Sequence, residues 1–114
     1  MLWGYDKKFS GVQNGQTHMI DKQEILYFES VDKRCFIYTA NETYETSMKL
    51  YEIEEYMPET GFFRSSKSQI INIFKIASLC PDFGGRIEVI MENKEKLIVS
   101  RQYAKLLKER LGLK

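Results

Sequence analysis

The stretch that decides the fold covers residues 62–76 and reads FFRSSKSQIINIFKI. Its apolar pairs, FF and II, are joined by a short polar arch (residues 64–68). Arg64 and Lys67 lie there among three serines, and the stretch contains no acidic residue. Apolar sequence that leads into a cationic, hydroxyl-rich loop presents hydrogen-bond donors on a rigid base, as a phosphate backbone or a guanine edge requires. The alternative interpretation is that both cations are ordinary solvated loop charges.

Length and composition indicate one globular domain. The chain has 114 residues, of which 43% are hydrophobic and 29% charged, enough to bury a core. No apolar run approaches the ~18 residues of a membrane span, so we expect no membrane insertion. Residues 1–8 have no signal-peptide pattern. We expect them to be an N-terminal extension, or the front of a longer protein, and residues 9–114 to be the domain.

Charge is distributed unevenly along the chain. The net charge is only +1, but residues 41–59 carry −5 and residues 94–114 carry +5. A chain segregated in this way is expected to have an acidic face and a basic face. We expect the acidic segment to point away from any nucleic acid.

Most of the predicted elements are strands. Asn14-Gly15 predicts a tight hairpin turn, because both residues tolerate positive φ. The predicted strands are rich in β-branched and aromatic residues and lie at residues 25–30, 35–39, 43–46, 76–80, 86–91 and 96–99. Short connections between the first three predict an antiparallel meander, with residues 25–30 as a central strand.

Two short helices complete the prediction. Ser47 is expected to cap a first helix with a core stripe at Leu50, Ile53 and Met57. Ser100 is expected to cap a second helix that ends before Gly112. Its predicted buried stripe is Tyr103, Leu107 and Leu111, with Ala104 and Leu106 flanking it. The predicted fold class is mainly β: an elongated antiparallel sandwich of eight to ten short strands with two short helices.

The sequence offers no set of residues for catalysis. The single histidine, His18, lies in the hairpin without a nearby nucleophile or acid, which argues against a triad. Cys35 and Cys80 have no metal-ligand spacing, and we expect both to be reduced. On composition alone, Cys35 is a small buried strand residue. We therefore predict that the protein is not an enzyme and uses no cofactor or metal.

Several segments occur in an order that resembles one known family. They are ILYFES at 25–30, FIYT at 36–39, LYEI at 50–53, FFRSSKSQIIN at 62–72 and LIVSR at 97–101. Together they resemble the LytTR DNA-binding domain of bacterial response regulators and small stand-alone regulators, over residues 16–112. The resemblance implies a cytoplasmic, sequence-specific transcriptional regulator. Its loops and the start of its last helix would enter the major groove of DNA.

The resemblance also implies where DNA contacts fall. Base contacts are expected at the turn after residues 25–30, in the arch and at the start of the last helix. The expected DNA-binding residues are Lys33, Arg34, Cys35, Arg64, Ser66, Lys67, Ser68, Arg101, Gln102, Lys105 and Lys108. For Arg64, a phosphate contact and an ion pair with an acid under the sheet both stay open. Some family members carry histidines at the first two places, so the preferred DNA sequence is not transferable.

The expected partner is double-stranded DNA. The resemblance also allows a dimer on tandem DNA sites and a membrane-bound regulatory partner. No receiver domain accompanies the resemblance in this sequence, which is expected to be a stand-alone regulator or an excised domain. The alternative function is a β-rich protein-interaction or ligand-sensing module that uses the acidic helix at residues 48–57.

Overall fold

Two antiparallel sheets and two α-helices make up the computed structural model, which describes residues 8–56 and 61–113. The strands are β1 (Lys8–Gln13), β2 (Gln16–Asp21), β3 (Ile25–Val31), β4 (Arg34–Thr39), β5 (Thr43–Thr46), β6 (Phe62–Ser66), β7 (Gln69–Asn72), β8 (Ile76–Pro81), β9 (Ile87–Met91) and β10 (Lys96–Val99). The helices are α1 (Leu50–Tyr56) and α2 (Arg101–Arg110), with short 3-10 turns η1 (Lys22–Glu24), η2 (Ile73–Lys75) and η3 (Phe83–Gly85). This architecture confirms the predicted mainly β fold class.

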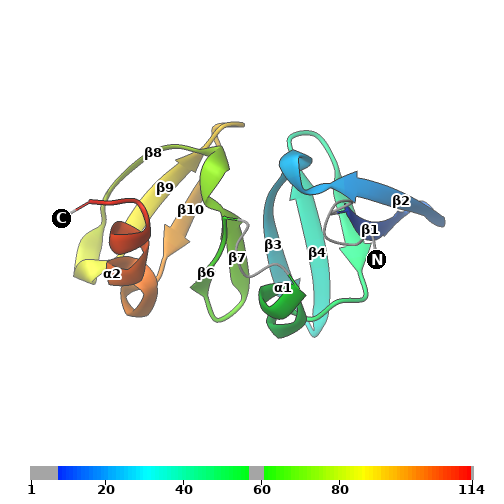
Figure 1. Cartoon of the computed structure of the whole chain (residues 1–114), viewed down its shortest axis with the longest axis horizontal. Helices are drawn as coiled ribbons and strands as arrows, with labels where there is room; N and C mark the ends of the chain where they lie inside the picture. Colours follow the sequence, from blue (N-terminus) through cyan, green and yellow to red (C-terminus); the bar gives the residue numbers. More distant parts are fainter. Residues whose placement is uncertain (1–7, 57–60, 114) are drawn as a thin grey trace.

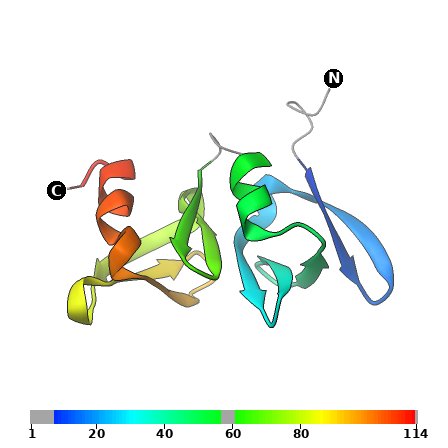
Figure 2. The same cartoon turned by 90° about the horizontal axis from the view of Figure 1, so that it is seen from below.

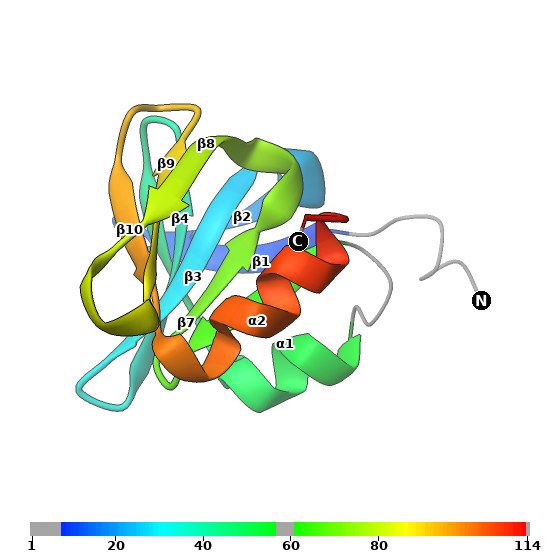
Figure 3. The same ribbon diagram turned by 90° about the vertical axis from the view of Figure 1, so that its left-hand side faces the viewer.

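The larger sheet has seven strands in the order β2-β1-β5-β4-β3-β7-β6, and the smaller has three in the order β10-β9-β8. In Figure 1, β6 and β7 lie between the small sheet and the rest of the large sheet. Figures 2 and 3 show both helices on one side of the molecule. The principal extents of 41 × 30 × 24 Å describe an elongated body.

The apolar pairs of residues 62–76 divide between two cores. Phe62 and Ile70 are buried with α1 in a first core, whereas Phe63 and Ile71 are buried with the small sheet and α2 in a second. Successive strand residues point to opposite faces, so a strand covered on both faces must be apolar at consecutive positions. This explains why the sequence has pairs of apolar residues here.

Turn chemistry sets the hairpins. Asn14 and Gly15, with φ of 52° and 76°, form the predicted two-residue turn between β1 and β2. The turn between β3 and β4 also needs two positive φ values, supplied by Asp32 at 51° and Lys33 at 68°. A left-handed conformation costs a residue with a side chain roughly 1–2 kcal/mol. The backbone of Lys33 is therefore strained, as the backbone of residues at functional sites often is.

The first helix differs from its prediction. It begins at Leu50 rather than near Ser47, because the carboxylate of Glu52 accepts the Lys49 backbone N–H at 2.7 Å, as in half of a capping box. Leu50 and Ile53 are buried as predicted, and Met57 lies outside the described residues.

The second helix ends as its sequence predicts. Gly112, at φ 74°, follows the C-cap, and the N–H groups of Gly112 and Leu113 bond to the carbonyls of Glu109 and Lys108. This pair of hydrogen bonds is a Schellman motif. At the other end, Ser100 is the N-cap residue, but its side chain makes no capping bond. Ala104 and Leu107 are buried, Tyr103 and Leu111 are half-buried, and Leu106, at the flank of the predicted stripe, is 51% exposed.

Candidate nucleic-acid interface

Three chain connections that are far apart in sequence meet at one rim of the molecule. They are the β3–β4 turn (residues 32–34), the β6–β7 turn (residues 66–68) and the start of α2 (residues 100–102), and together we call them the basic rim. The Ser30 N–H bonds to the Ser68 carbonyl at 2.8 Å, and the Ser100 N–H bonds to the Ser65 carbonyl at 3.0 Å. The first bond joins the end of β3 to the β6–β7 turn, and the second joins the end of β6 to the start of α2. Figure 1 shows both turns and the start of α2 at one end of the strands.

Arg64 braces the arch from the inside. Its Nε donates to the Ser66 carbonyl at 2.7 Å and its Nη2 to the Lys67 carbonyl at 2.5 Å. Its Nη1 forms an ion pair with Glu54 of α1 at 2.7 Å. All three guanidinium nitrogens are thus engaged inside the protein. Of the two roles left open by the sequence, the geometry favours the ion pair with an acid over a phosphate contact.

The serines of the arch fix its shape. The buried Ser65 hydroxyl donates to the Gln69 carbonyl at 3.1 Å, and the Ser66 hydroxyl accepts the Ser68 N–H at 3.2 Å. Lys67 and Ser68 are exposed at the tip, and Ser66 is half-buried beside them. The arch therefore presents Lys67 and two hydroxyl groups outward on a backbone that its own hydrogen bonds hold.

Arg34 opens β4 and is paired with an acid. Its Nη2 and Nε bond to the two carboxylate oxygens of Glu45 on β5 at 2.7 and 3.0 Å. The hydrogen bond and charge of Glu45 raise the pKa of Arg34, and the bond to Arg34 lowers the pKa of Glu45. Both groups are charged around neutral pH, and the Arg34 side chain is 61% exposed.

The other expected contact residues of this region are not engaged. Within residues 8–56 and 61–113, the side chains of Lys33, Lys67, Arg101, Gln102, Lys105 and Lys108 are exposed and make no hydrogen bond or ion pair. The stem of Arg101 passes over Gly85 of η3: a Cβ added to Gly85 would lie 3.0 Å from Arg101 Cγ. Arg101 is thus positioned by contact along its aliphatic stem while its guanidinium stays free.

Cys35 does not share this exposure. Side chains alternate along β4, so Arg34 faces outward and Cys35 inward, where it is 5% exposed in the first core. Burial raises the pKa of its thiol to about 11. The structure therefore supports the interpretation of Cys35 as a buried strand residue, and we leave it out of the proposed contacts.

The acidic helix lies closer to the arch than its charge suggests. Glu54 of α1 reaches Arg64 at the base of the arch, so the helix flanks β6 instead of lying at a distance from it. The sequence left an ion pair of Arg64 with an acid open but did not identify Glu54, and the contact of Glu45 with Arg34 was not foreseen. Both depend on how distant segments pack, and the only available signal was the excess of acid in residues 41–59.

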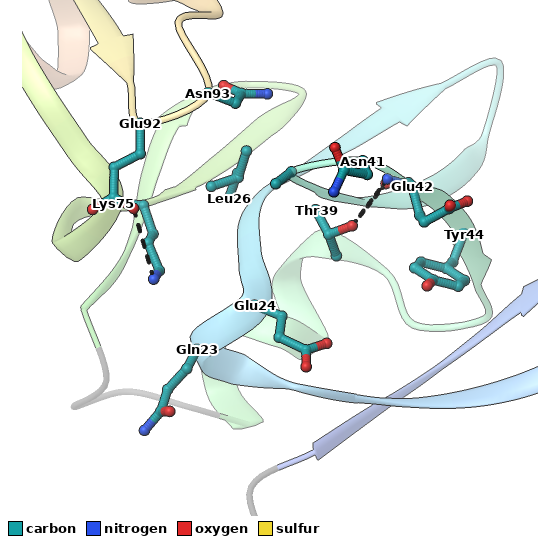
Figure 4. Close-up of a pocket in the computed structure, with 11 residues that line it drawn as sticks. Gln23, Glu24, Leu26, Thr39, Asn41, Glu42, Tyr44, Lys75, Glu92 and Asn93 are labelled. Atoms are coloured by element: carbon teal, nitrogen blue, oxygen red, sulfur yellow. Dashed lines mark hydrogen bonds and ion pairs between the residues drawn. The ribbon is translucent and has the colours of Figure 1, made fainter.

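A cleft lies at the opposite rim, between the β4–β5 turn and the β9–β10 turn, as Figure 4 shows. Its volume is about 560 Å³. Three acids, Glu24, Glu42 and Glu92, line it with a single base, Lys75, which is 3.9 Å from Glu92. A cleft with this excess of negative charge repels phosphate. The basic rim is the better surface for a nucleic acid.

In the part of the chain that the structure describes, no group of three acidic, cysteine or histidine side chains could hold a metal ion. Over the same residues, neither helix is long and apolar enough to cross a bilayer.

The chain is similar to known proteins in sequence and in fold. A family model described as the LytTr DNA-binding domain matches residues 15–112. An uncharacterized HTH-type transcriptional regulator of Staphylococcus aureus strain NCTC 8325 / PS 47 is 30% identical over 103 residues, which cover 90% of this chain and 69% of the relative. Its counterpart in strain MRSA252 is 29% identical over the same shares.

A solved LytTr DNA-binding domain from Bacillus cereus has the same fold. It superposes with a TM-score of 0.88 over 93% of this chain and 97% of its own, at 24% identity. In the described residues, α1 and α2 are separated by the five strands β6–β10. α1 and α2 therefore do not form a helix-turn-helix pair.

Proposed function

Because the chain belongs to the LytTR DNA-binding domain family, we propose that its basic rim reads a specific sequence in the major groove of double-stranded DNA. The chain is a DNA-binding transcription regulator. Which surface touches DNA, and how, is the proposal. The observation that carries it is the backbone connection of two hairpin turns and a helix start, each of which presents free cations or hydroxyl groups.

The rim suits a groove in shape and charge. The major groove is roughly 12 Å wide and admits a helix or a pair of strands. Tight turns and a helix end are narrow projections that fit this width. The start of α2 adds unpaired backbone N–H groups and the positive end of the helix dipole, which favour a phosphate.

We assign the contacts by side-chain chemistry. Arg101, free at its guanidinium, would read a guanine through two parallel hydrogen bonds. Lys67 and Lys33 would contact bases or backbone from the two turns. Contacts to phosphates set the register, and we assign them to Ser66, Ser68, Gln102, Lys105 and Lys108.

The cellular location that we propose follows from DNA as the partner. DNA lies in the cytoplasm of bacteria, and we propose that the protein acts there by binding alone, without catalysis. The domain boundaries at residues 9–114, a dimer on tandem sites and a membrane-bound regulatory partner stay predictions.

Selection of bound duplexes from a random pool tests the proposal. We expect enrichment of one motif, with affinity that falls by orders of magnitude between roughly 50 and 200 mM salt because several phosphates are contacted. No enrichment, together with a weak salt response, would favour the alternative of a protein-interaction module.

On the selected duplex, Arg101→Ala should cost ~1–3 kcal/mol of binding free energy and relax the preference at one base pair. Lys108→Ala is the matched control: it should weaken all duplexes about equally and lower the salt slope by about 1. Unchanged binding by Arg101→Ala would remove Arg101 from the role of reader.

A further inference from the structure

The ion pair between Arg34 and Glu45 has a particular geometry. The carboxylate of Glu45 faces the side of the guanidinium, where it accepts from Nε at 3.0 Å and from Nη2 at 2.7 Å. Guanidinium carries five N–H donors in a planar fork. The side-on contact uses the Nε hydrogen and one Nη2 hydrogen, and leaves the Nη1–Nη2 end of the fork.

That end of the fork has no hydrogen-bond acceptor within the part of the chain that the structure describes. Among the described residues, Arg34 makes no other hydrogen bond or ion pair, and its side chain is 61% exposed. Two parallel N–H donors on one edge match the O6 and N7 acceptors that guanine presents in the major groove. Arg34 therefore keeps the part of its fork that reads guanine while its other side is held.

A second contact fixes the plane of the fork. The Arg34 guanidinium lies over the Phe36 ring with its carbon 5.4 Å from the ring centroid, within the range of a cation–π contact. Phe36 and Glu45 are paired across β4 and β5, so both supports stand on adjacent strands. An arginine held in advance gives up less side-chain freedom on binding than a free one.

We propose that Glu45 is a positioning residue that aims Arg34 at a guanine and thereby determines sequence preference at one base pair. This inference rests on the proposed DNA-binding role of the basic rim. Arg34 is already among the expected base contacts, and the inference adds the role of Glu45. Arg101 is held along its stem, whereas Arg34 is held by a carboxylate.

A plain surface acid would behave differently. Glu45 near DNA repels phosphates, so an acid without a positioning role lowers the affinity for every sequence equally. Its removal would then strengthen binding to all duplexes and leave the preference unchanged. An acid that positions Arg34 must instead affect the ratio of affinities between the selected duplex and one of its single-base variants.

The test compares Glu45→Gln with Asp32→Asn in the full chain. Asp32 lies in the β3–β4 turn, acts on Arg34 through its charge without a hydrogen bond, and has a φ of 51° that asparagine tolerates. Both variants remove one negative charge close to Arg34, but only Glu45→Gln removes the carboxylate that holds it. Affinities are measured for the selected duplex and for every single-base-pair variant of it.

We expect Asp32→Asn to bind all duplexes slightly more tightly with unchanged ratios. Glu45→Gln should lower the discrimination at one G·C position by about fivefold or more, within the range of a single bidentate contact. Arg34→Ala should abolish the preference at the same position, and adding Glu45→Gln to it should leave the ratios of affinities between duplexes unchanged. Glu45→Asp keeps the charge but shortens the reach, and should lose discrimination as Glu45→Gln does.

The inference is overturned if Glu45→Gln strengthens all duplexes evenly, as Asp32→Asn does. It is also overturned if Arg34→Ala weakens all duplexes evenly and lowers the salt slope by about 1, because Arg34 would then contact a phosphate. Failure of the wild-type chain to select any duplex is a separate result, which would reject the proposed function itself. Thermal unfolding of each variant confirms that the fold is intact.

Discussion

At the scale of single residues, the charged side chains near the basic rim divide into supports and contacts. Arg64 uses its whole guanidinium on two carbonyls and one carboxylate, and only 22% of its side chain is exposed. Lys67 lies at the tip of the same arch with no partner in the described residues. Position in sequence does not distinguish the two residues, because they are only three residues apart. The hydrogen bonds distinguish them, since the side chain of Arg64 makes several and that of Lys67 makes none within the described residues.

Arg64→Lys tests the role of support. Lysine cannot reach both carbonyls and Glu54 in one geometry, so the free energy of unfolding should fall by roughly 2 kcal/mol, the value of a hydrogen bond to a charged group. Glu54→Gln removes only the ion pair and should cost less, about 0.5–1 kcal/mol. Urea unfolding measures both. Unchanged stability of Arg64→Lys would contradict the role of support. If this variant also bound DNA more weakly, Arg64 would instead contact a phosphate.

Because the thiol of Cys35 is buried, we expect the free energy of unfolding to fall at alkaline pH. Burial raises its pKa from 9.0 to about 11, so the unfolded chain loses this proton first. The contribution of this pKa shift to the free energy of unfolding is fully present below about pH 9 and is lost as the pH rises through about 11. Two pKa units correspond to roughly 3 kcal/mol.

Cys35→Ala removes this titration. Between about pH 8 and pH 11, under reducing conditions, it should lose roughly 2 kcal/mol less stability than the wild type in urea unfolding. Burial, with a hydrogen bond to Glu95, also raises the pKa of Tyr27, but that effect is common to both proteins and cancels. Equal losses in the two proteins would contradict the assignment.

At the scale of elements, η3 supports the start of α2. Gly84 and Gly85 both have positive φ, at 73° and 84°, but only Gly85 faces Arg101. Alanine at either position pays about 1–2 kcal/mol for the left-handed backbone. Only Gly85→Ala also pushes on the Arg101 stem, since its Cβ would lie 3.0 Å from Cγ, whereas Gly84 has open space around it.

Gly85→Ala should therefore reduce DNA affinity more than Gly84→Ala, although the two variants lose similar stability. The measurement is binding to the selected duplex, with thermal unfolding as the control on the fold. Equal affinities in the two variants would show that Arg101 does not depend on this contact.

Local sequence patterns predicted most elements because their causes are local. Asn14-Gly15 sets its turn through positive φ, and strict alternation from Ile87 to Met91 marks a half-buried strand. The start of α1 was missed because Glu52 reaches back to Lys49, which competes with a cap at Ser47. Alternation along β4 also decides between the two interpretations of Cys35, since Arg34 faces outward.

At the scale of the whole molecule, the site depends on contacts that no local pattern contains. The ion pair of Arg64 with Glu54 requires α1 to dock beside β6, and that of Arg34 with Glu45 requires the register of β4 and β5. The sequence predicted that cations from three segments serve one function. It could not predict which of them are already bound to acids.

The two cores hold the strands whose ends form the two different rims of the molecule. They hold β3 and β7 from both faces, so the turns at the ends of these strands are fixed in position. One rim then carries the free cations, and the other carries the acidic cleft of Figure 4. Binding by the basic rim leaves the cleft exposed to solvent.

The most direct test of the central claim is a backbone amide NMR titration of the full chain with its selected duplex. The largest shift changes are predicted at residues 30–34, 65–68 and 100–103, with residues 41–42 and 92–94 of the opposite rim unchanged. Largest changes at that opposite rim or along α1, with the basic rim unaffected, would contradict the account.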